Sequence, residues 1–439
     1  MDHVLTGDYT RLISRAGRKT LVRIRMRRRF MSRELRLALT LTTLTSGIVL
    51  FEPAPCDIFF LPLAVLAFLS TNRPDFGAAS GLYKFGSFVF IAGTCLSGYC
   101  ADDIGRAVLF GSITAYLLLS CYTYSRLIAE FGQEALNKII FWYVTGAVAV
   151  ALLVVMARFN LVPHSELFWR DPTGLRMRGT FKDPNVLAPY LVMAQMFFFL
   201  WFLERPRYRT ANVGIFVCGF GLLVLALVFA FSRAAFIHFG VSVASFVLCA
   251  LLIIRNPRTS LRLIIWSAIV FVIATYTTVA LLYTLRLNDV LRDRLQTQDY
   301  DAYRWDAQAR AWKMFQEHWL GIGPGQWTND TQILDMHNLY LRILTENGAI
   351  AFLGFCILLS VSVGTCVAGI CRRGPFANTY NVALSLLLGI LVSSFVIDTL
   401  HWRHFFLALA IGPGLSGFER WKQRAASAQG PGFIGRKSG

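Results

Sequence analysis

The sequence predicts an all-α polytopic membrane protein with about twelve transmembrane helices. Of its 439 residues, 55% are hydrophobic and only 15% are charged, which is more apolar than an ordinary soluble domain. The apolar residues gather in runs that reach the roughly 20 residues a helix needs to cross the hydrocarbon core. These runs are too long and unbroken for the alternating strands of a membrane barrel.

The first apolar run begins close to residue 35, and further runs follow to residue 418. Each run is bounded by charged residues, Gly or Pro, which gives its ends to within a few residues. An even number of spans places both termini on the same side. The expected spans are 35–52, 57–71, 83–99, 107–124, 139–158, 186–203, 211–230, 234–254, 262–284, 348–370, 379–397 and 403–418.

Lys and Arg residues set the orientation. Most of the 43 lie at the N-terminus, in short loops such as ERPRYRT, or in the tail, and loops of this kind face the cytoplasm. We therefore expect a basic cytoplasmic segment over 1–34 that is disordered, a membrane domain over 35–418, and a cytoplasmic tail over 419–439. Met26 or Met31 is an alternative start, which would leave the preceding residues without a fold of their own.

The net charge of +18 does not indicate a nucleic-acid-binding protein. Its densest cluster is RLISRAGRKTLVRIRMRRRFMSRELR, directly before the first span, where anionic membrane lipid is the expected partner. The nine cysteines are scattered through apolar runs, so we expect no disulfide framework. No Cys and His spacing indicates a metal site.

The remaining basic residues concentrate in two outer loops, 159–185 and 285–337. The first ends in RDPTGLRMRGTFKDPNVLAPYL, where Arg176 and Arg178 are separated by one residue. Asp183 is a predicted N-cap, with Pro184 in the first turn and Asn185 after it. A helix N-terminus beside two arginines suits a phosphate-like anion, although a capped helix alone would also explain the Asp and Pro.

Arg233 follows a very short turn, Phe231-Ser232, between two spans. It therefore lies at the membrane boundary. Two interpretations stay open with equal weight: the side chain snorkels to lipid phosphate, or it points into the bundle toward a ligand.

The loop over 285–337 contains an amphipathic helix that we expect to lie along the outer interface, between spans nine and ten. Arg304 and Arg310 flank its aromatic stripe, and the cluster Gly321–Gly325 ends it. That glycine cluster suits loop termination better than anion binding. The stripe consists of Trp305, Ala309, Trp312, Phe315 and Trp319, at steps of three and four residues.

The stretch MHNLYLRILTENG closes this loop and places His337 at the outer boundary, with Asn338 as a predicted cap. An isolated histidine at a membrane edge is usually an ordinary interfacial side chain. Here it closes the longest outer loop, which is rich in arginine, and neutral imidazole accepts a proton near neutral pH. His337 is therefore a candidate general base.

The sequence resembles the bacterial O-antigen ligase and O-antigen polymerase superfamily. Four motifs carry the resemblance, and they cover about half of the chain in the family's order. They are RGTFKDPNVLAPYL (178–191), FSRAAF (231–236), the run from Arg304 through Trp312 to GIGPGQW, and HNLYLRILTENGAIAFLGF (337–355).

The resemblance implies an inverting, metal-independent glycosyltransferase on the periplasmic face of the inner membrane, without a cofactor. Its donor would be a glycan on undecaprenyl pyrophosphate. By motif match the catalytic residues are His337, Arg178 and Arg233. We expect substrate binding by Arg176, Asp183, Asn185, Arg304, Arg310, Trp312 and Asn338.

Two alternatives remain open. A ligase passes the glycan to the lipid A core, whereas a polymerase passes it to a second lipid-linked glycan, and the motifs favour the ligase only slightly. Twelve spans with cytoplasmic termini also describe many transporters. A transporter is expected to show two similar halves and broken spans near mid-bilayer, which this sequence lacks.

Overall fold

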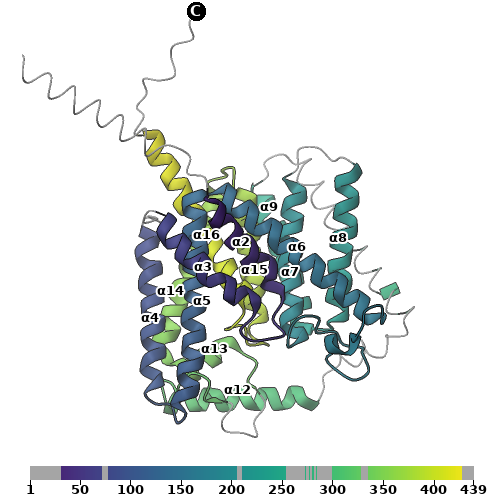
Figure 1. Ribbon diagram of the computed structural model, residues 1–439. Coiled ribbons are helices and arrows are strands. Elements are labelled where there is room, and N and C mark those ends of the chain that lie inside the picture. The colour runs from purple at the N-terminus through teal and green to yellow at the C-terminus, as the bar shows by residue number, and fades with distance from the viewer. Residues whose placement is uncertain are drawn as a thin grey trace, which may run out of the picture.

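The computed structural model describes residues 31–71, 78–204, 210–253, 299–327 and 335–427, with five single residues between 272 and 283. Within these ranges the regular structure is helical, and the single β-bridge joins Trp169 to Met177. The long helices stand side by side, and α12 lies across one end of them (Figure 1). We call this end the α12 end.

The helices follow the predicted spans closely, because the apolar runs set their length. Each predicted span except the ninth coincides with a helix of the structure. The ninth span, 262–284, lies almost entirely outside the described residues. The helices are α2 (Arg33–Leu44), α3 (Pro55–Ser70), α4 (Ala78–Gly98), α5 (Ile104–Phe131), α6 (Gln133–Arg158), α7 (Pro184–Leu203), α8 (Thr210–Phe229), α9 (Arg233–Ile253), α12 (Asp299–Glu317), α13 (Leu339–Arg342), α14 (Gly348–Cys371), α15 (Ala377–Ser393) and α16 (Arg403–Ser427).

Six helical stretches among the described residues are long and apolar enough to cross a membrane, and three shorter helices are also apolar. The chain is therefore a helical membrane protein with several spans, as predicted. The total of twelve stays a prediction.

Several helices differ from the predicted ends by a few residues, and the first and last spans differ most. The first was expected to continue to residue 52, but α2 ends at Leu44 and a single 3-10 turn, Thr45–Gly47, follows it. The hydroxyl of Thr45 bonds the Leu41 carbonyl at 2.7 Å and so satisfies a helix-end acceptor. The last helix, α16, continues past 418 to Ser427, because its polar residues sustain a helix that hydropathy alone does not detect.

Close packing of α4 against α14 fixes the beginning of α14 in space. A Cβ at Gly93 would lie 2.3 Å from the Ala351 nitrogen, and one at Gly354 would lie 2.3 Å from the Phe90 nitrogen. Small residues let two membrane helices approach to backbone contact in this way. The segment that precedes α14, which carries His337, is thereby anchored to the bundle.

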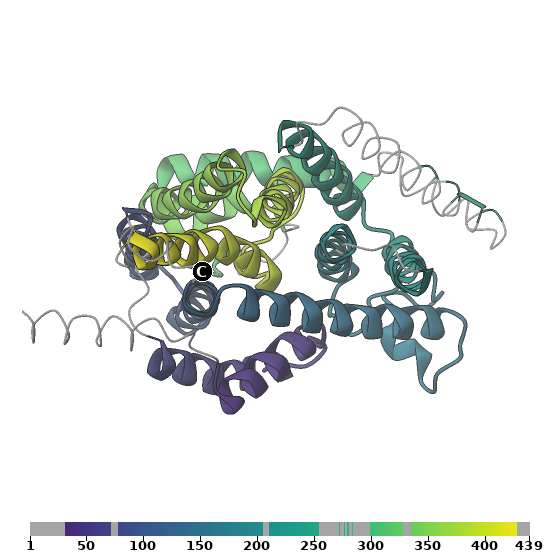
Figure 2. The ribbon, with the colours of Figure 1, turned by 90° about the horizontal axis from the view of Figure 1, so that it is seen from above.

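The helix α6 crosses the molecule when it is seen from above (Figure 2). It contacts α2 and α5 on one side and α7 and α8 on the other. This arrangement carries the chain from the first helices to the loop before α7, where Arg176 and Arg178 lie.

Candidate active site at the α12 end

The loop before α7 ends in the predicted helix cap. Asp183 Oδ1 accepts a hydrogen bond from the Asn185 backbone nitrogen at 2.6 Å, and Pro184 is the first residue of α7. The cap prediction is confirmed. The carboxylate satisfies one backbone donor, and the helix N-terminus lies at the α12 end.

Arg176 joins three segments. Its Nη2 donates to Asn185 Oδ1 at 2.9 Å, and its Nε donates to the Ala230 carbonyl at 3.2 Å. The buried hydroxyl of Ser232 donates to the same Asn185 oxygen at 2.9 Å. Arg176 and Asn185, both predicted to bind substrate, therefore hold the loop, α7 and the α8–α9 turn together.

Arg178 points to a different partner. Its Nε and Nη2 both donate to the Leu167 carbonyl, at 3.2 and 3.1 Å. The two arginines that the sequence places side by side therefore do not form one joint fork. These bonds fix the edge of the Arg178 guanidinium that carries Nε and Nη2. The Nη1 group takes no part in the contact with Leu167.

The turn before Arg233 is as short as predicted. Phe231 has a left-handed backbone conformation, with φ of 46°, which costs free energy in a non-glycine residue. Arg233 is then the first residue of α9 and is partly buried. Because Ser232 bonds Asn185, Arg233 begins its helix next to the beginning of α7.

The helix α12 is amphipathic, as predicted, but its inner face is formed by small residues. Ala307 and Ala311 are fully buried against Trp327 and Met336. The predicted aromatic stripe instead faces outward. Arg304 lies on the partly buried side, whereas Arg310 and Trp312 are exposed.

His337 lies between the described parts of the outer loop and α13. Its φ of 46° is also left-handed, and residues strained in this way concentrate at functional sites. Asn338 is the predicted cap: its Oδ1 accepts from the backbone nitrogens of Tyr340 and Leu341 at 3.0 and 3.1 Å. Its Nδ2 donates to the Phe395 carbonyl at 3.2 Å. This bond attaches Asn338, the residue after His337, to the segment between α15 and α16.

Charged side chains from four segments act on His337. Burial is the largest effect and lowers the pKa of this imidazole below its ordinary value. The positive charge of Arg304 lowers the pKa further. The negative charge of Asp335 raises it, and those of Asp398 and Asp183 raise it more weakly. His337 is therefore neutral near neutral pH, the form a general base requires. The predicted residues Asp183, Arg304 and His337 thus come within electrostatic range of one another.

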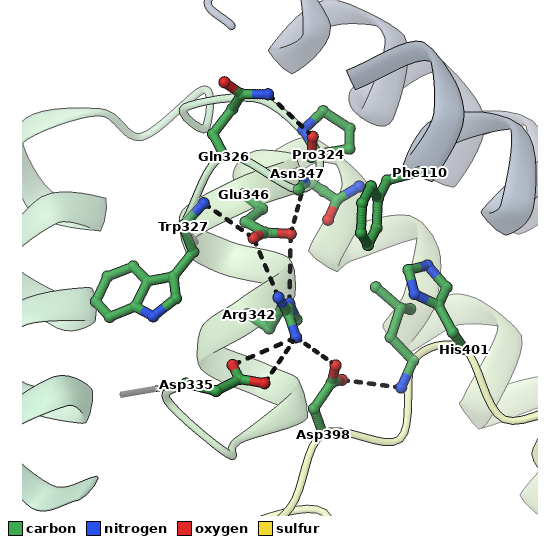
Figure 3. Close-up of polar contacts among 12 residues, drawn as sticks. Phe110, Pro324, Gln326, Trp327, Asp335, Arg342, Glu346, Asn347, Asp398 and His401 are labelled. Atoms are coloured by element: carbon green, nitrogen blue, oxygen red, sulfur yellow. Dashed lines mark hydrogen bonds and ion pairs between the residues drawn. The ribbon is translucent and has the colours of Figure 1, made fainter. Parts of the chain in front are cut away.

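Arg342, five residues after His337 in the sequence, forms a buried ion-pair network (Figure 3). Its Nη1 lies 2.6 Å from Asp398 and 3.4 Å from Asp335, and its Nε lies 3.4 Å from Glu346. The sequence alone did not predict that the Arg342 side chain would be buried. Three carboxylates hold it inside the protein, and two of them come from outside its own helix turn.

The glycine cluster after α12 binds an anion of the protein itself. Glu346 accepts from the backbone nitrogens of Gly325 and Trp327, at 2.9 and 3.2 Å. Gly321 and Gly323 have φ of 92° and 102°, which glycine adopts without steric cost. Loop termination was the favoured interpretation of these glycines, and the loop additionally clamps Glu346 beneath Arg342.

Sequence reasoning missed Asp398 and His401, which lie between α15 and α16. Burial raises the pKa of Asp398, but Arg342 and His401 outweigh it, so this pKa is lowered. Burial lowers the pKa of His401 to about 4, and its Nε2 lies 3.3 Å from the Thr114 hydroxyl. The detectable signal was DTLHWRH, a polar turn between the last two spans, on the same predicted side as His337.

A comparison with family models matches residues 218–356 to the family described as O-antigen ligase. No curated protein matches the chain. The matched segment contains Arg233, α12, His337, Arg342 and Glu346, whereas Arg178 and Asp183 lie before it and Asp398 lies after it. Over residues 218–356 the match confirms the resemblance inferred from the motifs: this segment is similar to the O-antigen ligase family.

Proposed function

We propose that this protein is an O-antigen ligase-like glycosyltransferase that moves a glycan from undecaprenyl pyrophosphate to the lipid A core. Members of the family transfer glycans and use lipid-linked glycan substrates. The observation that carries the proposal is the environment of His337. It is a neutral imidazole within electrostatic range of Arg304 and of Asp183, the residue that caps α7, at one end of a membrane-spanning bundle.

In the proposed reaction, an acceptor hydroxyl attacks the anomeric carbon of the donor's first sugar. The new glycosidic bond forms on the face opposite the departing group, so the configuration inverts. The bond between the anomeric carbon and the phosphate oxygen breaks, and undecaprenyl pyrophosphate leaves with the electron pair. His337 takes the proton of the attacking hydroxyl, a step typically worth about 10²–10⁴-fold in rate.

Arginines stabilise the charge of the departing pyrophosphate in this proposal. Arg178 offers the free edge of a guanidinium whose other edge is held by Leu167, and Arg233 stands at the beginning of α9. Fixed cations aimed at developing charge need no reorganisation during the reaction. No metal ion or cofactor takes part in the proposed steps.

The proposed location is the bacterial inner membrane, with the α12 end on the periplasmic side. Both termini would be cytoplasmic, which agrees with the basic N-terminal segment and with Arg420, Lys422 and Arg424 at the end of α16. The activated donor and the candidate base would then meet on the outer face.

The test is transfer of a labelled glycan by the purified protein in detergent. A ligase converts the undecaprenyl-linked donor and purified lipid A core into a lipid A-linked product. A polymerase, the alternative, instead lengthens the glycan when a second lipid-linked glycan is the acceptor. A transporter would produce neither product in detergent, where no sealed compartment exists, and that result would contradict the proposal.

A further inference from the structure

One side of α12 carries exposed tryptophans that the proposed chemistry does not use. Trp305 is 64% exposed and Trp312 is 47% exposed. They are seven residues apart, so two helical turns place them on the same side, about 10.5 Å apart along the axis. The ring of Phe315 lies 5.6 Å from that of Trp312 and packs beside it at a tilt.

The composition of α12 does not suit a membrane anchor. Helices that lie in a membrane surface combine a Lys- and Arg-rich polar face with a face of Trp, Phe and Leu. The sequence DYDAYRWDAQARAWKMFQE contains no Leu, Ile or Val and has more acidic than basic residues. The helix α12 therefore has the aromatic residues of a membrane-surface helix, but it lacks the aliphatic residues and the excess of positive charge that hold such a helix on anionic lipid.

Planar amides accompany the tryptophans instead. Gln308 and Gln316 lie four residues before and after Trp312, and so share its side of the helix. An aromatic face packs against the C–H groups of a pyranose ring, while amides donate to and accept from its hydroxyls. The spacing of the two indoles suits neighbouring units of one saccharide chain.

This side of α12 also begins at the candidate site. Gln308 Nε2 donates to the carbonyl of Met336, the residue before His337, at 3.2 Å. Arg304, one turn earlier, acts electrostatically on His337. A chain whose first sugar lies at His337 would therefore meet Gln308 and Trp312 as it continues outward.

We propose that the side of α12 with Trp305 and Trp312, the tryptophan platform, binds the glycan chain of the donor outside the membrane. This inference rests on the proposed function. The donor is the occupant because it carries the long glycan in both ligase and polymerase reactions, and because its first sugar must lie beside His337. The platform makes the enzyme prefer donors with long chains over donors with a single repeat unit.

The test compares long-chain and single-repeat donors with the variant Trp305→Leu/Trp312→Leu. Leucine keeps an apolar surface for lipid but cannot stack on sugars. We expect KM for the long-chain donor to rise about tenfold, which corresponds to about 1.4 kcal/mol, because two aromatic contacts with the glycan are lost. KM for the single-repeat donor should rise much less. Trp421→Leu, an exposed tryptophan on α16, is the matched control and should behave as wild type.

Equal effects on both donors, or none, would overturn the inference while leaving the proposed function standing. A second measurement separates the two claims when no transfer is seen. Polysaccharide of the source bacterium, freed from its lipid, is titrated against the purified protein and followed by calorimetry. Binding that the double variant loses and Trp421→Leu retains supports the platform, and binding that is absent or unaffected by the double variant rejects it.

Discussion

The guanidinium of Arg342 lies 2.6 Å from the carboxylate of Asp398, across 56 residues of sequence. This ion pair joins the segment that carries His337 to the chain between α15 and α16. On its other side Arg342 meets Glu346, whose carboxylate is held by backbone nitrogens of the glycine loop after α12. One buried cation thus ties together three segments at the α12 end.

Arg342→Met should destabilise the protein strongly, because it leaves Asp398 and Glu346 buried without their cation. Breaking a buried ion pair typically costs about 3–5 kcal/mol. The measurement is thermal unfolding of the purified protein in detergent. Arg372→Met is the control, since Arg372 pairs with Glu419 at 2.8 Å but is 40% exposed, and an exposed pair is worth about 1 kcal/mol or less. Equal loss of stability in the two variants would argue against a buried network.

The pH dependence of transfer should follow the charges around His337. A general base must be unprotonated, so the rate falls as pH drops through its pKa, which burial and Arg304 lower. Arg304→Gln removes a positive charge that lowers the pKa of His337, and should therefore move the acid limb of kcat/KM to higher pH. Asp335→Asn removes a negative charge that raises the pKa of His337, and should therefore move the acid limb to lower pH. Lys313→Gln, whose side chain is 77% exposed on the same helix, is the control, and shifts of the opposite sign would contradict the assignment.

Arg178→Lys should reduce kcat/KM about tenfold or more, although it preserves the charge. Arginine uses Nε and Nη2 for the Leu167 carbonyl and still presents Nη1, whereas a lysine ammonium cannot fix a planar fork in this way. Steady-state kinetics with the undecaprenyl-linked donor measures the change. Arg170→Lys, on the exposed part of the same loop, should have little effect; an unimpaired Arg178→Lys enzyme would remove Arg178 from the proposed pyrophosphate site.

The sequence was sufficient for the helices and for the local caps. Apolar runs define membrane helices because each residue's burial in lipid depends on its own side chain. The caps by Asp183 and Asn338 involve backbone groups only two or three residues away, so their residue types and spacing predict them.

The network around Arg342 could not be predicted in the same way. Its partner Asp398 lies two helices further along the chain, and which carboxylate meets which cation depends on how α14, α15 and α16 pack. The inner face of α12 shows the same limit. Helical periodicity identified the aromatic stripe, but it did not show that the helix packs through Ala307 and Ala311, where closely packed segments leave room only for small side chains.

The measurement that tests the account most directly is glycan transfer by His337→Gln, which keeps a polar side chain of similar size but cannot take up a proton. Folding is checked by thermal unfolding, and donor binding is measured separately. The account predicts a fall in kcat of about 10²-fold or more, with unfolding temperature and donor binding near those of wild type. A folded His337→Gln protein that transfers glycan at the wild-type rate would show that His337 is not the base.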